Sequence, residues 1–186
     1  MYEINKNEES FYEIKGSKFI SYIYNVKNID EIKEIIKEKE KLYSDATHIT
    51  YAYNVNGIKK KSDDNEPSGT AGMPILNVID KNYLTNVLII VIRYFGGIKL
   101  GAGGLVRAYT KAATDVLNKV EKHELKERYQ IEIKTNYKEL DKVLYLLKDK
   151  EIKKEFNEAI IIKAILTKEE IKELDNNNIN YTKKDL

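Results

Sequence analysis

The sequence has no cysteine, no tryptophan and only two histidines among its 186 residues. Without cysteine, the chain cannot form disulfides, iron–sulfur clusters, cysteine-based zinc sites or a thiol nucleophile. His48 and His123 cannot make an all-histidine metal site within one chain. The longest aliphatic run covers residues 87–92, far short of the ~20 residues that span a bilayer, and the first residues lack the basic-then-apolar pattern of a secretory signal. We therefore expect a cytoplasmic protein with no membrane association, no metal and no cofactor.

Hydrophobic residues make up 42% of the chain and charged residues 33%, which is typical of folded globular domains. The length corresponds to one large or two small domains at ~100–200 residues each. The net charge is only +2, but residues 80–120 hold six bases and two acids, whereas residues 129–186 hold twelve of each. A local excess of positive charge attracts phosphate even on a nearly neutral chain, although it is equally typical of a solvated helix face.

The first part of the chain predicts strands around a single helix. Residues 10–14 and 18–26 are rich in strand-forming residues and flank Gly16-Ser17, which predicts a hairpin. Asn28 stands three residues before Glu31, so a capped helix is expected over residues 29–43. Alternation predicts a half-buried strand over residues 46–55, with His48 on its polar side.

A different composition begins at residue 56. Residues 56–74 hold both prolines, three glycines and an acidic cluster, which predicts a long shaped loop. Residues 86–95 are apolar nearly throughout, so we expect a central strand that is buried on both faces. That strand runs into the glycine-rich residues 96–104, and a helix is expected over residues 105–120.

A second domain is predicted after a highly charged linker at residues 121–128. The expected order is a strand at 129–135, a helix capped by Asn136 and Glu139, strands at 151–156 and 159–166 around a turn at 157–158, a helix capped by Thr167 and Glu170, and a strand at 179–182. Residues 159–166 could equally form a buried helix turn. The β-α-β-β-α-β order is ferredoxin-like, so the sequence predicts two α+β domains, residues 1–120 and residues 129–186.

The junction between the central strand, the glycines and the following helix is the strongest candidate site. Free N–H groups and the positive dipole end of a helix favour anions there, and glycine lets a phosphate approach the backbone. The Gly-Lys-Ser/Thr ending of a phosphate-loop NTPase is absent, and the dinucleotide fingerprint would need Gly or Ala in place of Val106. The glycines could instead serve only close packing of the helix on the strand. The expected phosphate-binding residues are Arg93, Lys99, Gly101, Gly103, Gly104, Arg107 and Lys111.

Four further polar residues are expected to flank the same surface: His48, Asp63, Asp64 and Glu66. The three carboxylates could hold a hard cation loosely, but the following Pro-Ser-Gly-Thr favours a role as local hydrogen-bond acceptors. His48 could also act as a base beside Ser68 or Thr70 with an aspartate behind it, although no nucleophile-elbow motif is present. We therefore expect no catalytic residue.

Four stretches resemble the signatures of the Impact family, in its bacterial YigZ-like branch. They are residues 46–48 (ATH), 52–53 (AY), 63–74 (DDNEPSGTAGMP) and 91–109 (VIRYFGGIKLGAGGLVRAY). The resemblance covers about residues 10–120, and residues 129–186 are similar to the small C-terminal domain of bacterial members. It implies an α/β sandwich like the second domain of ribosomal protein S5, followed by a ferredoxin-like domain similar to domain V of elongation factor G. Asn65 replaces the usual glycine of the acidic loop, residues 63–66, and asparagine also accepts positive φ.

The resemblance also implies a function. Both domain relatives act on RNA or the ribosome, and eukaryotic Impact proteins regulate translation by competing for the activator of a starvation-responsive kinase. The expected function is therefore non-enzymatic binding of RNA, a ribosomal component or a translation-regulatory protein, with modulation of translation. Two alternatives stay open: an enzyme acting on a small phosphorylated substrate, because the S5-like fold also hosts small-molecule kinases, and a pure protein-interaction module.

Overall fold

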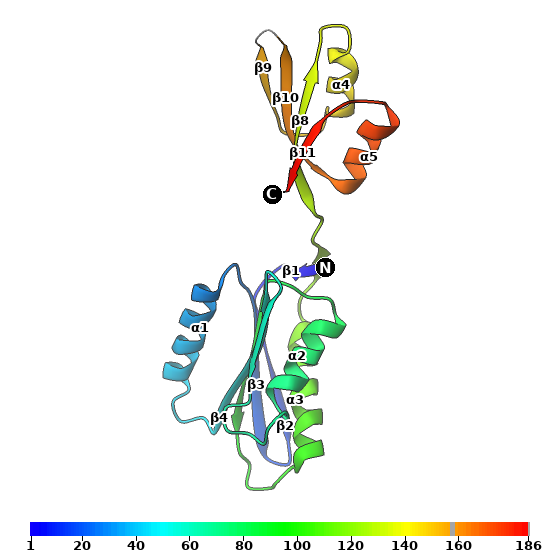
Figure 1. Cartoon of the computed structure of the whole chain (residues 1–186). Coiled ribbons are helices and arrows are strands. Elements are labelled where there is room, and N and C mark those ends of the chain that lie inside the picture. Colours follow the sequence, from blue (N-terminus) through cyan, green and yellow to red (C-terminus); the bar gives the residue numbers. More distant parts are fainter. Residues whose placement is uncertain (157–158, 186) are drawn as a thin grey trace. The chain divides into compact units, whose positions relative to one another are not determined.

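A computed structural model describes residues 1–156 and 159–185 of the chain (Figure 1). The chain forms two compact units, Met1–Leu125 and Lys126–Leu186. Their secondary structure confirms the prediction of a two-domain α+β protein. The turn expected at residues 157–158 lies outside the described residues. None of the helices in the described part of the chain is both long enough and apolar enough to cross a membrane.

Unit 1 is built on a five-stranded antiparallel sheet in the order β2-β3-β6-β4-β5. The strands are β2 (Glu8–Ile14), β3 (Ser17–Asn25), β4 (His48–Val55), β5 (Ile58–Ser62) and β6 (Val87–Tyr94). The expected hairpin of β2 and β3 is present, and β6 is the central strand, buried from Val87 to Arg93. Continuous burial of β6 follows from its apolar sequence, because a strand buried on both faces needs no polar alternation.

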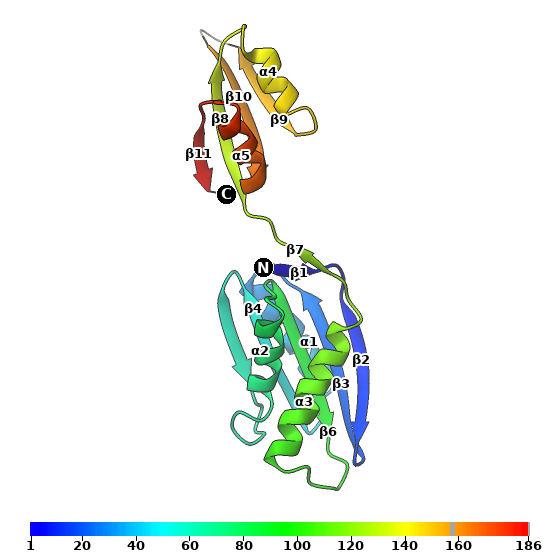
Figure 2. The same cartoon turned by 90° about the vertical axis from the view of Figure 1, so that its right-hand side faces the viewer.

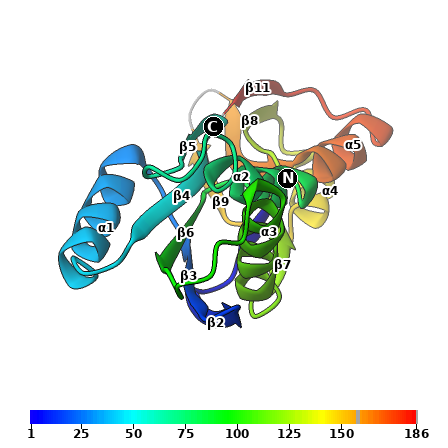
Figure 3. The ribbon, with the colours of Figure 1, turned by 90° about the horizontal axis from the view of Figure 1, so that it is seen from below.

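Helices cover both faces of this sheet (Figure 3). On one face lies α1 (Ile29–Leu42), which begins at the expected cap because the Asn28 side chain accepts a hydrogen bond from the Glu31 N–H. On the other face lie α2 (Gly72–Lys81) and α3 (Ala102–Leu117). Two apolar cores result, one on each side of the sheet.

Three predictions for this unit were wrong in detail. Strand β4 is not half-buried, because residues of the parity of His48 face α2 and α3 while those of the parity of Ile49 face the α1 side. Residues 56–74 are not a continuous loop: they contain β5 and the start of α2. Helix α3 begins at Ala102 rather than at residue 105, so Gly103 and Gly104 lie within its first turn.

Two short strands pair separately from the five-stranded sheet. Strand β1 (Tyr2–Ile4) runs antiparallel to β7 (Lys122–Glu124). Part of the segment expected to be a linker is therefore a strand of unit 1, and the division between the units falls after Leu125.

Unit 2 has the ferredoxin-like order of elements (Figure 2). They are β8 (Arg128–Thr135), α4 (Leu140–Leu146), β9 (Ile152–Phe156), β10 (Ile160–Thr167), α5 (Lys168–Asn176) and β11 (Thr182–Asp185). The antiparallel sheet has the order β11-β8-β10-β9, and residues of both helices share one core with β8 and β10. The Thr167–Glu170 capping box is present, and β10 is a strand rather than a helix turn. The last strand begins at Thr182, later than the expected residues 179–182.

Candidate functional site

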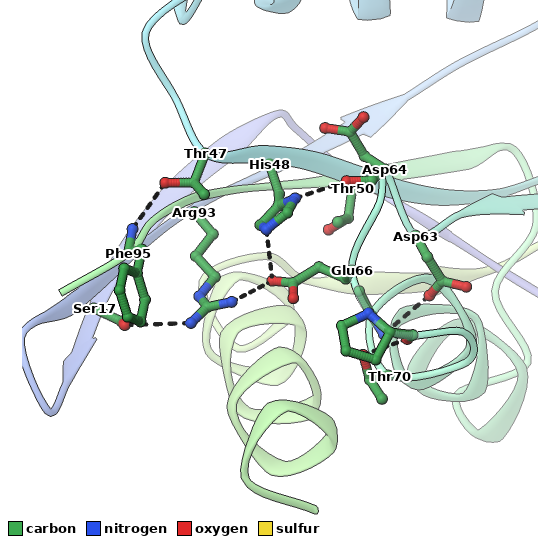
Figure 4. Close-up of polar contacts among 12 residues, drawn as sticks. Ser17, Thr47, His48, Thr50, Asp63, Asp64, Glu66, Thr70, Arg93 and Phe95 are labelled. Atoms are coloured by element: carbon green, nitrogen blue, oxygen red, sulfur yellow. Dashed lines mark hydrogen bonds and ion pairs between the residues drawn. The ribbon is translucent and has the colours of Figure 1, made fainter. Parts of the chain in front are cut away.

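A buried ion pair lies on the sheet face that α2 and α3 cover. Arg93 belongs to β6, and its Nη1 lies 2.5 Å from Oε1 of Glu66, which comes from the segment between β5 and α2 (Figure 4). The exposed fraction is only 5% for Arg93 and 7% for Glu66. Neither charge could be buried alone without a large desolvation cost, so each requires the other. Arg93 is therefore an internal partner of the acidic loop, which sets it apart from the exposed basic residues of the expected phosphate site.

Tyr109 of α3 joins this pair. Its hydroxyl donates to Glu66 Oε1 over 2.7 Å, and the residue is fully buried. Burial, followed by the neighbouring Glu66 carboxylate, raises the pKa of Tyr109 far above its ordinary value, so the hydroxyl remains a donor throughout the physiological range. Glu66 consequently ties together β6, α3 and its own segment.

His48 of β4 faces the same carboxylate. Its Nδ1 lies 2.7 Å from the Asp64 carbonyl oxygen, and because a carbonyl only accepts, Nδ1 must carry the hydrogen. With that hydrogen on Nδ1, neutral His48 has a lone pair on Nε2. Nε2 lies 3.7 Å from Glu66 Oε1, so protonated His48 forms an ion pair with Glu66. The structure thus brings together His48, Glu66 and Arg93, three residues chosen from the sequence.

The two aspartates of the acidic loop are occupied by backbone amides. Asp63 accepts from the N–H groups of Gly69, Ala71 and Gly72 at 2.8–3.1 Å, which anchors the start of α2. Burial alone would raise the pKa of Asp63, but these three bonds outweigh it and hold that pKa below its ordinary value. Asp64 accepts from the Ile49 N–H at 2.5 Å. Both carboxylates are hydrogen-bond acceptors within the fold.

This arrangement bears on the metal and hydrolysis hypotheses. Within residues 1–156 and 159–185, no group of three or more His, Asp or Glu side chains is placed to hold a metal ion. The Thr70 hydroxyl donates to the Pro67 carbonyl at 2.6 Å rather than to His48, and His48 is oriented by a backbone carbonyl rather than by an aspartate. The described residues therefore do not assemble the triad that the sequence left open.

The glycine segment, residues 96–104, leads from β6 into α3. Its first residue is fixed by close backbone packing: a Cβ on Gly96 would lie 1.9 Å from the carbonyl carbon of Gly16 in the β2–β3 turn. Gly101 precedes α3 with φ 71°, a conformation that favours glycine, and it has no side chain to cap the helix. The first helical bond runs from the Leu105 N–H to the Gly101 carbonyl. The amides of residues 102–104 therefore precede the helical bonding pattern, as an anion site requires.

The remaining basic residues differ in their surroundings. Lys99 and Arg107 are exposed, and neither forms an ion pair with any residue that the structure describes. The Arg107 side chain lies over the first turn of α3, with Nη1 3.5 Å from where a Cβ of Gly103 would stand. Lys111 instead pairs with Asp115 at 2.8 Å and lies 5.1 Å from the centre of the Tyr12 ring. Lys99 and Arg107 are thus two cations at the glycine segment with no ion pair to a described residue.

Sequence reasoning missed two members of the buried cluster. The candidate site residues did not include Tyr109, and Ser17 was expected only in the turn of the predicted hairpin. Ser17 is fully buried; its hydroxyl oxygen lies 3.5 Å from Arg93 Nη2 and accepts from the Gly96 N–H at 3.1 Å. The alternation of β3 places Ser17 and Phe19 on one face, which was the available signal for Ser17. No local pattern indicates that Tyr109 reaches Glu66.

The Impact N-terminal domain matches residues 15–117, which include every residue of this cluster. The chain belongs to the Impact family. It is 46% identical over 110 residues to the Impact family member YvyE of Bacillus subtilis, covering 58% of this chain and 51% of that protein. It is 33% identical over 113 residues to the Impact family member YigZ of Escherichia coli, covering 58% and 55%. These relatives support the expected YigZ-like branch, and the chain spans about half of their length.

The fold of both units also has a solved counterpart. A structure described as the crystal structure of a hypothetical protein has a TM-score of 0.67 and 23% identity. The likeness covers 100% of this chain and 96% of that one. It shows that the two-unit architecture recurs in another protein.

Proposed function

We propose that this Impact protein binds the phosphate backbone of RNA through the glycine segment and the start of α3, and that it modulates translation. The observation that carries the proposal is the combination of uncapped amides at residues 102–104 with two exposed, unpaired cations, Lys99 and Arg107. Amides at a helix start bind anions, and nearby cations strengthen the attraction. The family resemblance supports the link to translation.

The buried cluster has a supporting part in this proposal. Arg93, Glu66 and Tyr109 connect β6 with α3 on the two sides of the glycine segment. They hold the strand end and the helix in a fixed relation, so the amides need little rearrangement to meet a phosphate. Pre-organisation of this kind lowers the entropic cost of binding.

No specific observation favours the enzyme alternative. A small-molecule enzyme generally needs a concave pocket lined by converging polar groups. A surface hollow of about 1130 Å³ lies in unit 2, where its lining includes four bases and four acids. That balanced lining does not select a phosphorylated substrate.

The test is an RNA titration at several salt concentrations. Fluorescence anisotropy of a labelled 20-nucleotide RNA would be measured with wild type, Lys99→Ala and Arg107→Ala at stepped NaCl concentrations. Each variant should lower the slope of log affinity against log salt by about one, because each removes about one phosphate contact. The weakening should be similar for different sequences, since phosphate contacts carry no base information.

The matched control is Lys33→Ala. Lys33 lies on α1, on the opposite side of the sheet, and pairs with Asp30 in an exposed contact. It should bind RNA with the wild-type affinity and slope. If Lys99→Ala and Arg107→Ala, both folded, behave like Lys33→Ala, the glycine segment is not the RNA site.

A further inference from the structure

Phe95 is an aromatic residue in an unusual position, half-exposed between β6 and the glycine segment. Its exposed fraction is 46%. Its backbone is nevertheless held: the N–H donates to the Thr47 hydroxyl at 2.9 Å, and the Thr47 N–H donates to the Arg93 carbonyl at 2.9 Å. A large apolar side chain is therefore presented to solvent on a rigid support, at the end of the central strand (Figure 4).

One side of the ring rests on the buried cluster. The Arg93 guanidinium carbon lies 5.7 Å from the centre of the Phe95 ring, within the range of a cation–π contact. Arg93 is in turn held by Glu66. Because the ring is already supported, a flat ligand that stacks on it would not need to order the side chain first.

The residues that follow leave room for such a ligand. Gly96 is packed against the Gly16 backbone, but Gly97 is open: a Cβ on Gly97 would meet nothing within 4 Å. Lys99 then follows in the same segment, exposed and without an ion pair in the described residues. An aromatic surface, open space and a free cation thus succeed one another within five residues.

We propose that Phe95 is a stacking platform for an unpaired base of single-stranded RNA whose backbone phosphates are held by Lys99 and Arg107. This inference rests on the proposed function and names its substrate class. Every base has a flat π-face, so aromatic stacking beside a positively charged groove binds single strands with little sequence preference. In a duplex the bases are paired and stacked on one another, so none is free to stack on Phe95.

The experiment uses Phe95→Leu, which keeps an apolar side chain of similar size but removes the aromatic face. Single-stranded RNA carrying 2-aminopurine and a duplex of the same sequence would be titrated at several NaCl concentrations. In the wild-type complex, stacking on Phe95 should quench the fluorescence of 2-aminopurine. Phe95→Leu should lower the affinity for the single strand by about tenfold and abolish this quenching. The salt slope should stay at the wild-type value, because no charge is removed. The affinity for the duplex should not change.

Two controls separate stacking from other roles. Phe11→Leu makes the same substitution at a 59%-exposed phenylalanine opposite Ile20, on the α1 side of the sheet, and should bind like wild type. Ile58→Ala removes a 58%-exposed apolar side chain from the edge strand β5, outside the glycine segment. It should also bind RNA like wild type.

The outcomes distinguish this inference from the proposed function. Wild-type single-strand affinity and quenching in folded Phe95→Leu would overturn the stacking inference while leaving salt-dependent RNA binding intact. Equal losses on single strand and duplex would also overturn it, because Phe95 would then act on the shape of the site. If wild type shows no salt-dependent binding to either RNA, both proposals fail.

Discussion

Two sets of charged residues in unit 1 lie in opposite environments. Arg93 and Glu66 are almost completely buried and neutralise each other, whereas Lys99 and Arg107 are exposed beside the uncapped start of α3. Residues 91–109 therefore contain one basic residue that stabilises the fold, Arg93, and two that face solvent, Lys99 and Arg107. The difference shows that a basic residue in such a motif cannot be assigned to a ligand until its burial is known.

The largest effect should come from breaking the buried pair. Arg93→Ala leaves Glu66 as an uncompensated buried carboxylate, so the free energy of unfolding should fall by about 3–5 kcal/mol. Urea denaturation at neutral pH measures it. Adding Glu66→Gln to Arg93→Ala should recover part of the loss, because the stranded charge is removed. If Arg93→Ala lowers the free energy of unfolding by less than about 1 kcal/mol, the buried pair stabilises the protein no more than an exposed ion pair does.

An intermediate effect is expected at Asp63, which anchors α2. Asp63→Asn weakens the acceptor for three backbone amides, so the free energy of unfolding should fall by about 1–2 kcal/mol at neutral pH. Because the pKa of Asp63 is lowered in the folded protein, the unfolded chain binds the proton more readily. This stabilisation is full above the ordinary aspartate pKa and is lost as pH falls through the folded-state pKa.

The pH dependence gives that prediction its check. Unfolding free energies measured from pH 7 down to pH 3 should decline less steeply for Asp63→Asn than for wild type. Parallel declines would show that the carboxylate is not the charged acceptor of the α2 amides.

The smallest effect belongs to the exposed set. Lys99→Ala and Arg107→Ala should each change the free energy of unfolding by no more than about 0.5 kcal/mol, since surface substitutions away from structural contacts usually do so. Thermal denaturation of both variants measures this. A loss of unfolding free energy above about 1.5 kcal/mol in either variant would show that the residue supports the fold. Its RNA titration would then not test a phosphate contact alone.

Local signals predicted much of the fold. The Asn28 cap fixed the start of α1, and the Thr167–Glu170 capping box fixed the start of α5, because both act between residues three apart. The uninterrupted apolar residues of β6 correctly indicated a central strand. The ferredoxin-like order of unit 2 followed from periodicity together with capping and turn residues.

Helix α2 was missed because its signals conflict. Pro74 and the neighbouring glycines suggested a loop, but proline is tolerated in the first turn of a helix, where its missing N–H has no helical partner. Ile75, Val78 and Ile79 are buried on one side of that helix. Strand β5 was hidden for another reason: it is an edge strand with three consecutive lysines, so it shows no apolar alternation.

The candidate site was predictable in composition but not in pairing. His48, Glu66 and Arg93 could be chosen from the sequence as residues of one surface. Which of the three carboxylates Arg93 contacts depends on a pairing across 27 positions of sequence, which local pattern does not encode. Tyr109 is separated from Glu66 by 43 positions and lies in a helix face that apolar packing alone would explain.

The pairing of β1 with β7 determines how unit 1 responds to mechanical load. Tyr2 pairs with Glu124 and Ile4 with Lys122, and the Leu125 N–H donates to the Met1 carbonyl, so the two ends of the unit leave from the same end of one antiparallel ribbon. Tension between the two ends acts perpendicular to the strands, so it loads the hydrogen bonds one pair at a time, beginning with Tyr2 and Glu124. We expect β7 to separate from β1 at low force while the five-stranded sheet, the buried ion pair and the glycine segment remain folded.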